Sequence, residues 1–327
     1  MSGKVVKCSL KGHKDSIASV TSDRARGLLI SSSDDDTIRL WDVRIRNSSI
    51  RLLRVPENDG DINVCHSSGD LIVVSRDRHL YGYDLRFNES IIVPAPSFSY
   101  TCTSADCELN DFGFSKDGSR IAAPTDDGDV DIVCTKSFTR LSTISSVHSN
   151  IASVARYMPN DNNLVTTGYD CFVTNAKVSE SYKLDKRIGI GSLLPPIEED
   201  EGTTQTVNPP FGTCMEISSD SSNPNIAIGA GDGSVFVLPS KRGKPDFRSI
   251  AWGGSNVHSV AVCGLSWGTS DSSVWSVGND SVLINMDPDR IRIRYPIGWK
   301  PNSVTSLGDN KVAIAGLNTE IDILEFF

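Results

Sequence analysis

The sequence is poor in glutamate, in histidine and in long apolar runs. Of its 327 residues only 10 are Glu, against 31 Asp, and only 5 are His. Glutamate favours helices, whereas aspartate, serine and glycine favour turns and caps, and these three types supply 102 residues. The shortage of Glu therefore argues against a helix-rich fold. It favours many short strands joined by tight turns.

The longest charge-free apolar runs span five or six residues, too few for a transmembrane helix. The stretch from Met1 to Cys8 carries lysines where a signal peptide needs an apolar segment. We therefore expect an intracellular protein, in the cytoplasm or the nucleus, that binds no membrane. The net charge of −9 disfavours direct binding of nucleic acid and predicts that partners steered by charge are basic.

The eight cysteines include no Cys-x-x-Cys pair, so we expect no structural zinc and interpret most of them as reduced core residues. The sequence also lacks a G-x-S-x-G elbow, a phosphate loop and a dinucleotide-binding Gly-x-Gly-x-x-Gly. These absences predict a protein that is not an enzyme and that uses no cofactor or metal.

A repeat runs along the whole chain. Strands are expected at 17–22, 27–33 and 37–42, with Asp35 in the turn before the third strand and 22 residues after His13. His148 with Asp170 and His258 with Asp280 repeat this spacing. Each Asp is followed three residues later by an apolar residue, and further copies without the His bring the anchors to seven, at residues 35, 77, 127, 170, 232, 280 and 318.

The Gly12-His13 opening, the turn Asp35 and the Trp41-Asp42 close resemble the WD-repeat pattern. This resemblance implies an all-β fold, a seven-bladed β-propeller that occupies residues 1–327 as a single domain. The last blade would lack its fourth strand, which the segment 5–10 would supply to close the ring. The Pro- and acid-rich stretch at about 193–206 is interpreted as an insertion that loops out of the ring.

The WD-repeat pattern also implies a hydrogen-bonded set in blade one. It would join His13, Ser31 or Ser33 (Ser33 being the candidate taken), Asp35 and Trp41. Blades four and six would keep His148 with Asp170 and His258 with Asp280, although Ala176 and Met286 replace the tryptophan. A His near a Ser and an Asp also has the composition of a catalytic triad. Its recurrence at the blade period favours a structural role.

Asp42-Val43-Arg44 closes blade one, and Asp84-Leu85-Arg86 closes blade two at the same distance from its anchor. This Asp-x-Arg resembles the box of WD-repeat substrate receptors that bind the propeller adaptor of cullin-4 RING ubiquitin ligases. The resemblance implies that Arg44 and Arg86 contact the adaptor while another face presents an unknown substrate. The alternative is that both arginines are merely solvated.

A second hypothesis is a general peptide-reading scaffold for basic, histone-like tails. The residues just before the anchors would line the narrow face of the ring, namely Asp34, Arg76, Asp126, Tyr169 and Asn279. A third is an enzyme acting at the centre of the propeller, which needs a convergent set of titratable residues that the sequence does not reveal. We expect a protein that is a monomer by itself.

The arginines between blades one and two, at positions 39, 44, 46, 51 and 54, are interpreted as solvated on strand faces rather than as a phosphate site. Within the WD-repeat family, the chain further resembles one particular type. That resemblance rests on His148-Ser149-Asn150-Ile151, on Asn208-Pro209 after the acidic insertion and on the glycine-rich stretch 229–233.

Overall fold

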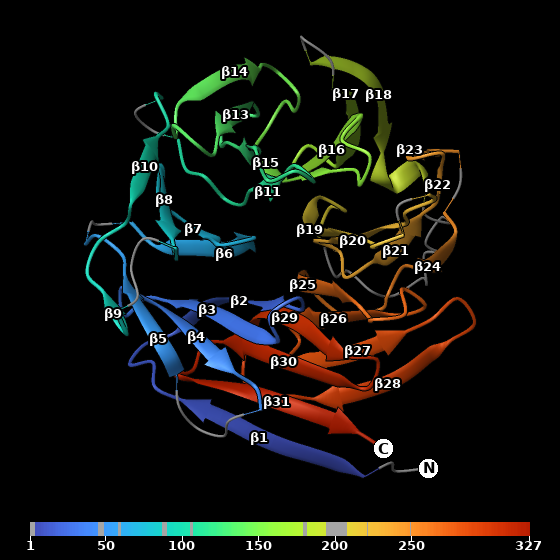
Figure 1. Cartoon of the computed structure of the whole chain (residues 1–327). Helices are drawn as coiled ribbons and strands as arrows, with labels where there is room; N and C mark the ends of the chain where they lie inside the picture. The colour runs from blue at the N-terminus through green and yellow to red at the C-terminus, as the bar shows by residue number, and fades with distance from the viewer. Residues whose placement is uncertain are drawn as a thin grey trace.

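The computed structural model describes residues 4–44, 49–57, 60–86, 90–104, 107–178, 182–193, 208–220, 222–248 and 250–327. Across these ranges the chain forms antiparallel sheets that follow one another around a ring (Figure 1). Seven sheets of four or five strands are the blades, so the predicted seven-bladed β-propeller is confirmed. The described part contains one short 3-10 helix, η1 (Ile190–Ser192), and no helix that could cross a membrane.

Each blade is given from its inner to its outer strand. Blade one is β2 (Ile17–Asp23), β3 (Leu28–Ser33), β4 (Thr37–Asp42) and β5 (Ser49–Arg54); blade two is β6 (Ile62–Ser68), β7 (Leu71–Arg76), β8 (His79–Asp84) and β10 (Phe98–Thr101). Blade three is β11 (Gly113–Phe114), β12 (Arg120–Pro124), β13 (Val130–Cys134) and β14 (Arg140–Ile144); blade four is β15 (Ala152–Tyr157), β16 (Asn163–Gly168), β17 (Phe172–Lys177) and β18 (Lys183–Gly189). Blade five is β19 (Gly212–Ile217), β20 (Ile226–Ala230), β21 (Val235–Leu238) and β24 (Trp252–Gly254); blade six is β25 (Val262–Trp267), β26 (Val274–Gly278), β27 (Val282–Met286) and β28 (Ile291–Pro296). Blade seven is β29 (Pro301–Gly308), β30 (Lys311–Gly316), β31 (Glu320–Phe326) and β1 (Val5–Lys11).

The ring closes as the sequence predicts. β1 is the outer strand of blade seven, and it pairs antiparallel with β31 from Val5 opposite Phe326 to Lys11 opposite Glu320. All seven anchors fall in the loops that join the second strand of a blade to the third. A blade period read from the sequence therefore located every turn of this kind.

Two additions to the blades were not predicted. The connection that follows β8 contributes β9 (Ile92–Val93), which pairs in parallel with β5 as a fifth strand of blade one. The connection that follows β21 folds into a hairpin of β22 (Ser240–Lys241) and β23 (Lys244–Pro245). These insertions account for the long steps from anchor 77 to 127 and from 232 to 280.

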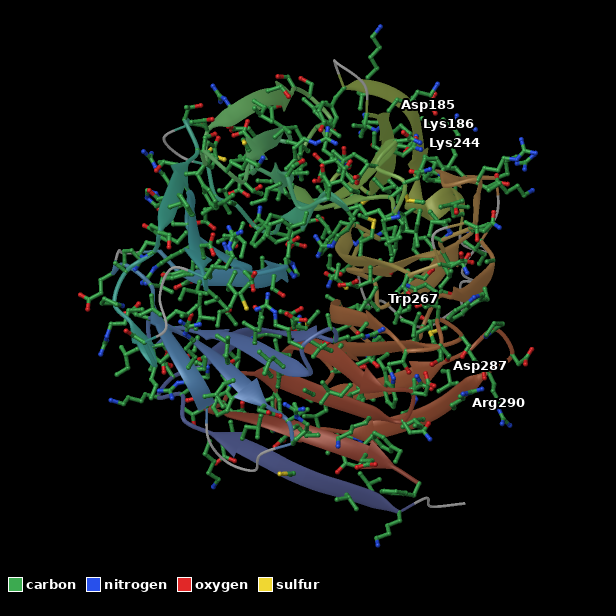
Figure 2. All side chains as sticks on the ribbon, viewed as in Figure 1. Asp185, Lys186, Lys244, Trp267, Asp287 and Arg290 are labelled. Atoms are coloured by element: carbon green, nitrogen blue, oxygen red, sulfur yellow. The ribbon has the colours of Figure 1, made fainter. Side chains whose placement is uncertain are left out.

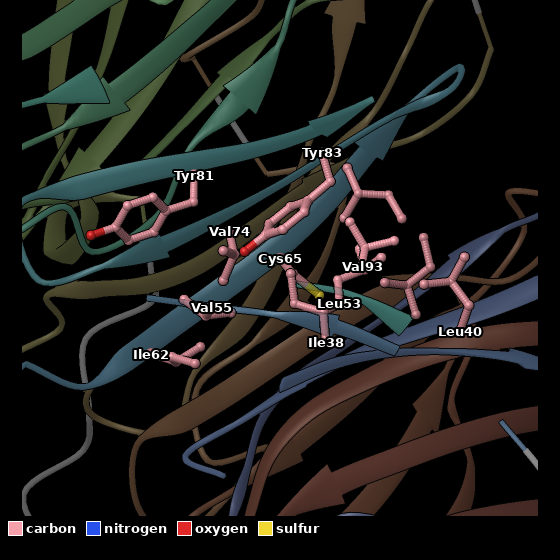
Figure 3. Close-up of a cluster of buried hydrophobic side chains, with 12 residues drawn as sticks. Ile38, Leu40, Leu53, Val55, Ile62, Cys65, Val74, Tyr81, Tyr83 and Val93 are labelled. Atoms are coloured by element: carbon pink, nitrogen blue, oxygen red, sulfur yellow. The ribbon is translucent and has the colours of Figure 1, made fainter. Parts of the chain in front are cut away.

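The hydrophobic core lies between neighbouring blades. Figure 3 shows the cluster between blades one and two, where Ile38 and Leu53 of the first pack near Cys65 and Tyr83 of the second. Because each middle strand is covered on both sides, β3 and β7 bury almost every residue rather than every second one. Burial of both faces fixes the register of these strands and so the positions of the loops that they end in.

The two faces of the ring carry different loops. We call the face that carries the seven anchors the anchor face. The opposite face carries the loops between first and second strands and between third and outer strands, including those that follow Asp42 and Asp84, and we call it the corner face. All eight cysteines are free thiols; Cys65, Cys102 and Cys107 are buried and the other five are half-buried.

Candidate partner-binding surfaces

The histidine networks hold the anchor loops of three blades. In blade one, Nδ1 of His13 lies 3.0 Å from a carboxylate oxygen of Asp35, and Nε2 lies 2.8 Å from Oγ of Ser31. The indole N–H of Trp41 donates to the same Oγ at 2.9 Å. The hydroxyl is therefore that of Ser31 rather than Ser33, whose Oγ instead donates to the carbonyl of Asp15.

Blades four and six contain the same arrangement without the tryptophan. His148 lies 2.9 Å from both Asp170 and Thr166, and His258 lies 3.0 Å from Asp280 and 2.9 Å from Ser276. In each blade the hydroxyl residue follows the histidine by 18 positions. That fixed spacing is the signal that distinguishes Ser31 from Ser33 in the sequence.

Burial and the histidine–carboxylate contact shift the pKa values of these side chains in opposite directions. Burial lowers the pKa of His13 against the opposing effect of Asp35, and it lowers that of His258 against Asp280. Burial alone would raise the pKa of Asp35, but hydrogen bonds from His13, Thr37 and the Lys14 amide together hold it below its usual value. The same histidine–carboxylate contact recurs at the blade period and holds an anchor loop in each of the three blades.

The two predicted Asp-x-Arg motifs form matched brackets. The side chain of Arg44 donates from Nε to Oδ1 of Asp42 at 2.8 Å and from Nη2 to Oδ2 at 2.6 Å. Arg86 meets Asp84 in the same way, at 2.9 and 2.5 Å. In both, the Arg backbone N–H also donates to the Asp, at 3.0 Å.

Each bracket holds an exposed cation beside an ionised carboxylate. Hydrogen bonds from Arg44 lower the pKa of Asp42 to about 2, and the Arg86 side chain lowers that of Asp84, so both carboxylates stay ionised at neutral pH. The Asp side chains are nearly buried, whereas the side chain of Arg44 is 73% exposed and that of Arg86 is 64% exposed. Since both follow the third strand of their blade, both lie on the corner face, on neighbouring blades.

A third bracket was missed by the sequence analysis. In blade five Arg248 donates from Nε to Asp246 at 2.7 Å and from Nη2 at 2.5 Å, and its side chain is 72% exposed. The inserted hairpin β22–β23 displaces the motif along the sequence, so that it no longer stands nine residues after its anchor. The backbone N–H of Asp246 donates to the carbonyl of Pro239, which returns the chain to the end of the third strand. The triplet Asp246-Phe247-Arg248 is therefore the signal that could have found it.

An apolar strip lies along the outer edge of blade one. The segment that begins at Ser90 lies against blade one, where the carbonyl of Ile91 accepts the N–H of Leu52 and the carbonyl of Ser90 accepts Nε of Arg51. Ile50, Ile91 and Ile92 are exposed along this edge. A patch of apolar residues beside fixed arginines has the composition of a protein interface.

The proposed peptide-reading residues do not all share one environment. Asp34 and Asn279 are exposed, and Asp126 accepts a hydrogen bond from Asn110 at 2.6 Å. Tyr169 lies at the mouth of the central channel with its ring centroid 4.7 Å from that of Phe211. Arg76, in contrast, is only 7% exposed, and its guanidinium donates to the carbonyls of Gly60 and Pro56 and to Asp36.

Carboxylates gather on the anchor face around these residues. Burial and the neighbouring Asp61 and Asp15 raise the pKa of Asp34. Burial, Asp126, Asp77 and Asp61 raise the pKa of Glu108. Carboxylates that raise the pKa of Asp34 and of Glu108 must lie close to these two groups, so this part of the anchor face carries several negative charges.

The central channel brings together titratable residues that the sequence did not reveal. The channel encloses about 300 Å³ and is lined by the inner strands of the blades. His66 and Arg156 contact opposite oxygens of Asp111, at 3.2 and 2.8 Å, and so join blades two, three and four. Glu216 of blade five lines the same channel, and its pKa is raised by burial, an effect that Arg156 and His66 oppose.

Most polar side chains of the channel already have hydrogen-bond and ion-pair partners within the protein. Asp111 also accepts the backbone N–H of Phe112, and Nη1 of Arg156 donates to the carbonyls of Phe112 and Ala155. Burial raises the pKa of Cys65 to about 11 and that of Cys214 to about 12, so neither is a thiolate nucleophile at neutral pH. In the described part of the chain, no three His, Cys, Asp or Glu side chains are placed to hold a metal ion.

The remaining predictions concern the arginine run between blades one and two and the acidic insertion. Of the arginine run, Arg39 donates to Ser49 and Arg51 to Ser90, Arg54 is exposed, and Arg46 lies outside the described residues. The predicted acidic insertion at 193–206 lies outside the described residues except for Leu193.

Comparison with known proteins gives matches consistent with this architecture. The family model described as "WD domain, G-beta repeat" matches residues 4–42, which span β1 and the first three strands of blade one. The WD repeat-containing protein 53 homolog of Dictyostelium discoideum is 24% identical over 351 aligned residues, which cover 98% of this chain and 94% of that protein. This is the type that the residues of blade four, the 208–209 segment and the 229–233 stretch resemble.

Proposed function

We propose that the chain, a WD-repeat β-propeller, is a non-catalytic protein–protein interaction scaffold that docks on the propeller adaptor of a cullin-4 RING ubiquitin ligase through Arg44 and Arg86. Proteins of this family generally act as scaffolds rather than as enzymes. The observation that supports the docking is the pair of identical brackets at corresponding corners of adjacent blades. A substrate would then be presented by another part of the ring.

The chemistry of the brackets suits an interface. A guanidinium offers a rigid, planar set of donors and is desolvated more readily than an ammonium. Because Asp42 already holds Arg44 in place, and Asp84 holds Arg86, little side-chain entropy remains to be lost on binding. The exposed Ile50, Ile91 and Ile92 at the outer edge of blade one supply further apolar area for a partner.

Direct binding of the purified adaptor tests the proposal. In the double variant Arg44→Ala/Arg86→Ala we expect the affinity to fall by about 30-fold or more, because two anchoring side chains are truncated at one interface. The matched control is Arg248→Ala, which removes the same kind of bracket from blade five. The proposal is wrong if the double variant binds like the wild type, or if Arg248→Ala weakens binding as much.

The second candidate function, reading of basic peptides, rests on the carboxylates of the anchor face. Asp34 and Glu108 lie among other acids that raise their pKa values, and Tyr169 is an exposed ring at the mouth of the channel. A lysine-rich peptide would meet both negative potential and an aromatic face. Asp126→Ala/Tyr169→Ala should then weaken binding of a fluorescent lysine-rich peptide, whereas Asp289→Ala on the corner face should not. Equal binding by both variants would dismiss this function.

A further inference from the structure

A cationic surface lies on the corner face where blades four and five meet. We define it by six side chains from β17, β18 and the connection between β21 and β24: Lys177, Lys183, Lys241, Arg242, Lys244 and Arg248. It stands out because the whole chain has a net charge of −9. Figure 1 places β22 and β23 across the ring from β4 and β5, so this surface is separate from the Arg44 and Arg86 brackets.

Blade four contributes two lysines in direct opposition. Lys177 at the end of β17 pairs with Lys183 at the start of β18, so two like charges face the same side of the sheet. Like charges directly opposite one another destabilise a strand pair. Asp185 relieves this repulsion only in part, since its Oδ1 lies 3.4 Å from Nζ of Lys177.

The hairpin of blade five is fastened onto blade four. The carbonyl of Gly243 accepts the side-chain amides of Asn163 at 3.1 Å and Asn160 at 3.4 Å. Nζ of Lys244 lies 2.8 Å from Oδ2 of Asp185, a pair that Figure 2 shows at the edge of the ring. The hairpin therefore brings Lys244 to the same carboxylate that Lys177 of blade four contacts.

The third bracket completes the surface. Asp246 fixes the guanidinium of Arg248, and the same carboxylate lies 3.5 Å from Nζ of Lys241. Each of the two carboxylates within the surface, Asp185 and Asp246, is thus shared by two cations. Their oxygens are largely covered, whereas Lys177, Lys241, Lys244 and Arg248 all keep substantial exposure.

The nearby turns do not cancel this charge. Asp161 accepts the backbone N–H of Lys116, and Asp220 accepts those of Ser222 and Asn223. Among the described residues of this surface and of the turns beside it, the six cations outnumber four carboxylates, those of Asp161, Asp185, Asp220 and Asp246. Every one of these carboxylates is engaged within the protein, so an incoming ligand meets mainly exposed ammonium and guanidinium groups.

We propose that this cationic surface binds an acidic peptide segment of a partner protein. A carboxylate side chain would meet the exposed guanidinium of Arg248 on the side that Asp246 does not occupy, and neighbouring acidic residues would meet the opposed lysines of blade four. Binding would relieve the repulsion between Lys177 and Lys183. The Arg44 and Arg86 brackets take no part in it.

A peptide suits the surface better than a nucleic acid does. Single strands need exposed aromatic side chains on which bases stack. Here Phe247, the aromatic residue of the third bracket, is buried, and the hydroxyl of Tyr182 is bonded to that of Tyr157. The anchor-face carboxylates and the overall negative charge would also repel an extended polyanion.

The test uses the full chain and a fluorescein-labelled peptide of alternating glutamate and serine, with fluorescence anisotropy as the readout. We expect Lys244→Gln/Arg248→Gln to weaken binding by about tenfold or more, and Arg248→Lys to have an intermediate effect because it keeps the charge but loses the fork. The matched control is Lys116→Gln/Lys136→Gln, which removes two exposed lysines from the corner face of blade three and should bind like the wild type. Thermal unfolding of each variant checks that the fold is kept.

Three outcomes would overturn the proposal: no binding of the acidic peptide, equal loss in the blade-three control, or tighter binding of a single-stranded oligouridine that is lost in the same blade-five variant. Arg44→Ala/Arg86→Ala should leave the affinity for the peptide unchanged. This result separates the cationic surface from adaptor docking, so either idea can fail without the other.

Discussion

Arg76 of blade two donates from Nη1 to Oδ1 of Asp36 in blade one, at 2.5 Å. The same guanidinium donates to the carbonyls of Gly60 and Pro56. Its place just before anchor 77 suggested a side chain that reads ligands on the ring face. The structure instead makes it a cross-blade clasp, because a buried cation needs a carboxylate and carbonyl partners.

Removing the clasp should destabilise the ring. We expect Arg76→Ala to lower the free energy of unfolding by about 3 kcal/mol, the lower end of the range for breaking a buried ion pair, because Asp36 is still 31% exposed. Chemical denaturation measures the change. Arg54→Ala, which truncates an exposed arginine of the same blade pair, should shift stability by less than about 0.5 kcal/mol.

The hydroxyl of Ser31 should matter more than that of Ser33. Ser31→Ala leaves the indole N–H of Trp41 and Nε2 of His13 without their partner in a buried site, and we expect a loss of about 1–3 kcal/mol. Ser33→Ala removes bonds to backbone groups nearer the surface, so its cost should be smaller. Urea unfolding of the two variants measures both losses of stability. A larger loss for Ser33→Ala than for Ser31→Ala would contradict the assigned network.

The carboxyl of Glu216 should make stability depend on pH. Burial raises its pKa, so the folded chain binds this proton more tightly than the unfolded chain does. The stability contributed by this group is therefore highest below the unfolded pKa and is lost as the pH rises through the folded pKa. Glu216→Gln should raise Tm at pH 7.5 and reduce the difference in Tm between pH 5.5 and 7.5. Exposed Glu57→Gln is the control, and an unchanged pH profile for Glu216→Gln would count against this assignment.

The tip of the inserted hairpin depends on Gly243. Its φ is +69°, and a Cβ there would come within 1.9 Å of Nδ2 of Asn160. Gly27 has nearly the same φ, +68°, but open space around it, so Gly27→Ala reports the backbone strain alone, about 1–2 kcal/mol. Gly243→Ala should cost more and should speed hydrogen exchange at residues 240–245. Equal costs for the two variants would show that contact with Asn160 does not hold the hairpin.

The regular parts of the molecule could be predicted from the sequence, and the inserted parts could not. The spacing of His13 and Asp35 recurs because the second and third strands of each blade are joined by a loop at the same face of the ring. The period of one repeat therefore predicted the positions of all seven anchor loops. The β22–β23 hairpin interrupts that spacing, and this is why the bracket of Asp246 and Arg248 escaped notice. The channel set of His66, Asp111 and Arg156 comes from three blades with no common motif, and only the closed ring brings these residues together.

The pairing of β1 with β31 has a consequence for how the chain is made. Ser9 and Asp322 are hydrogen-bonded across this strand pair and are 313 residues apart. The ring therefore cannot close until almost all of the described chain has been synthesised. Until then β1 lacks its partner strand and the blades already formed keep an open edge that can pair with other chains. During synthesis, the unpaired strand edge of the incomplete ring is therefore exposed to other polypeptide chains until β31 has been made.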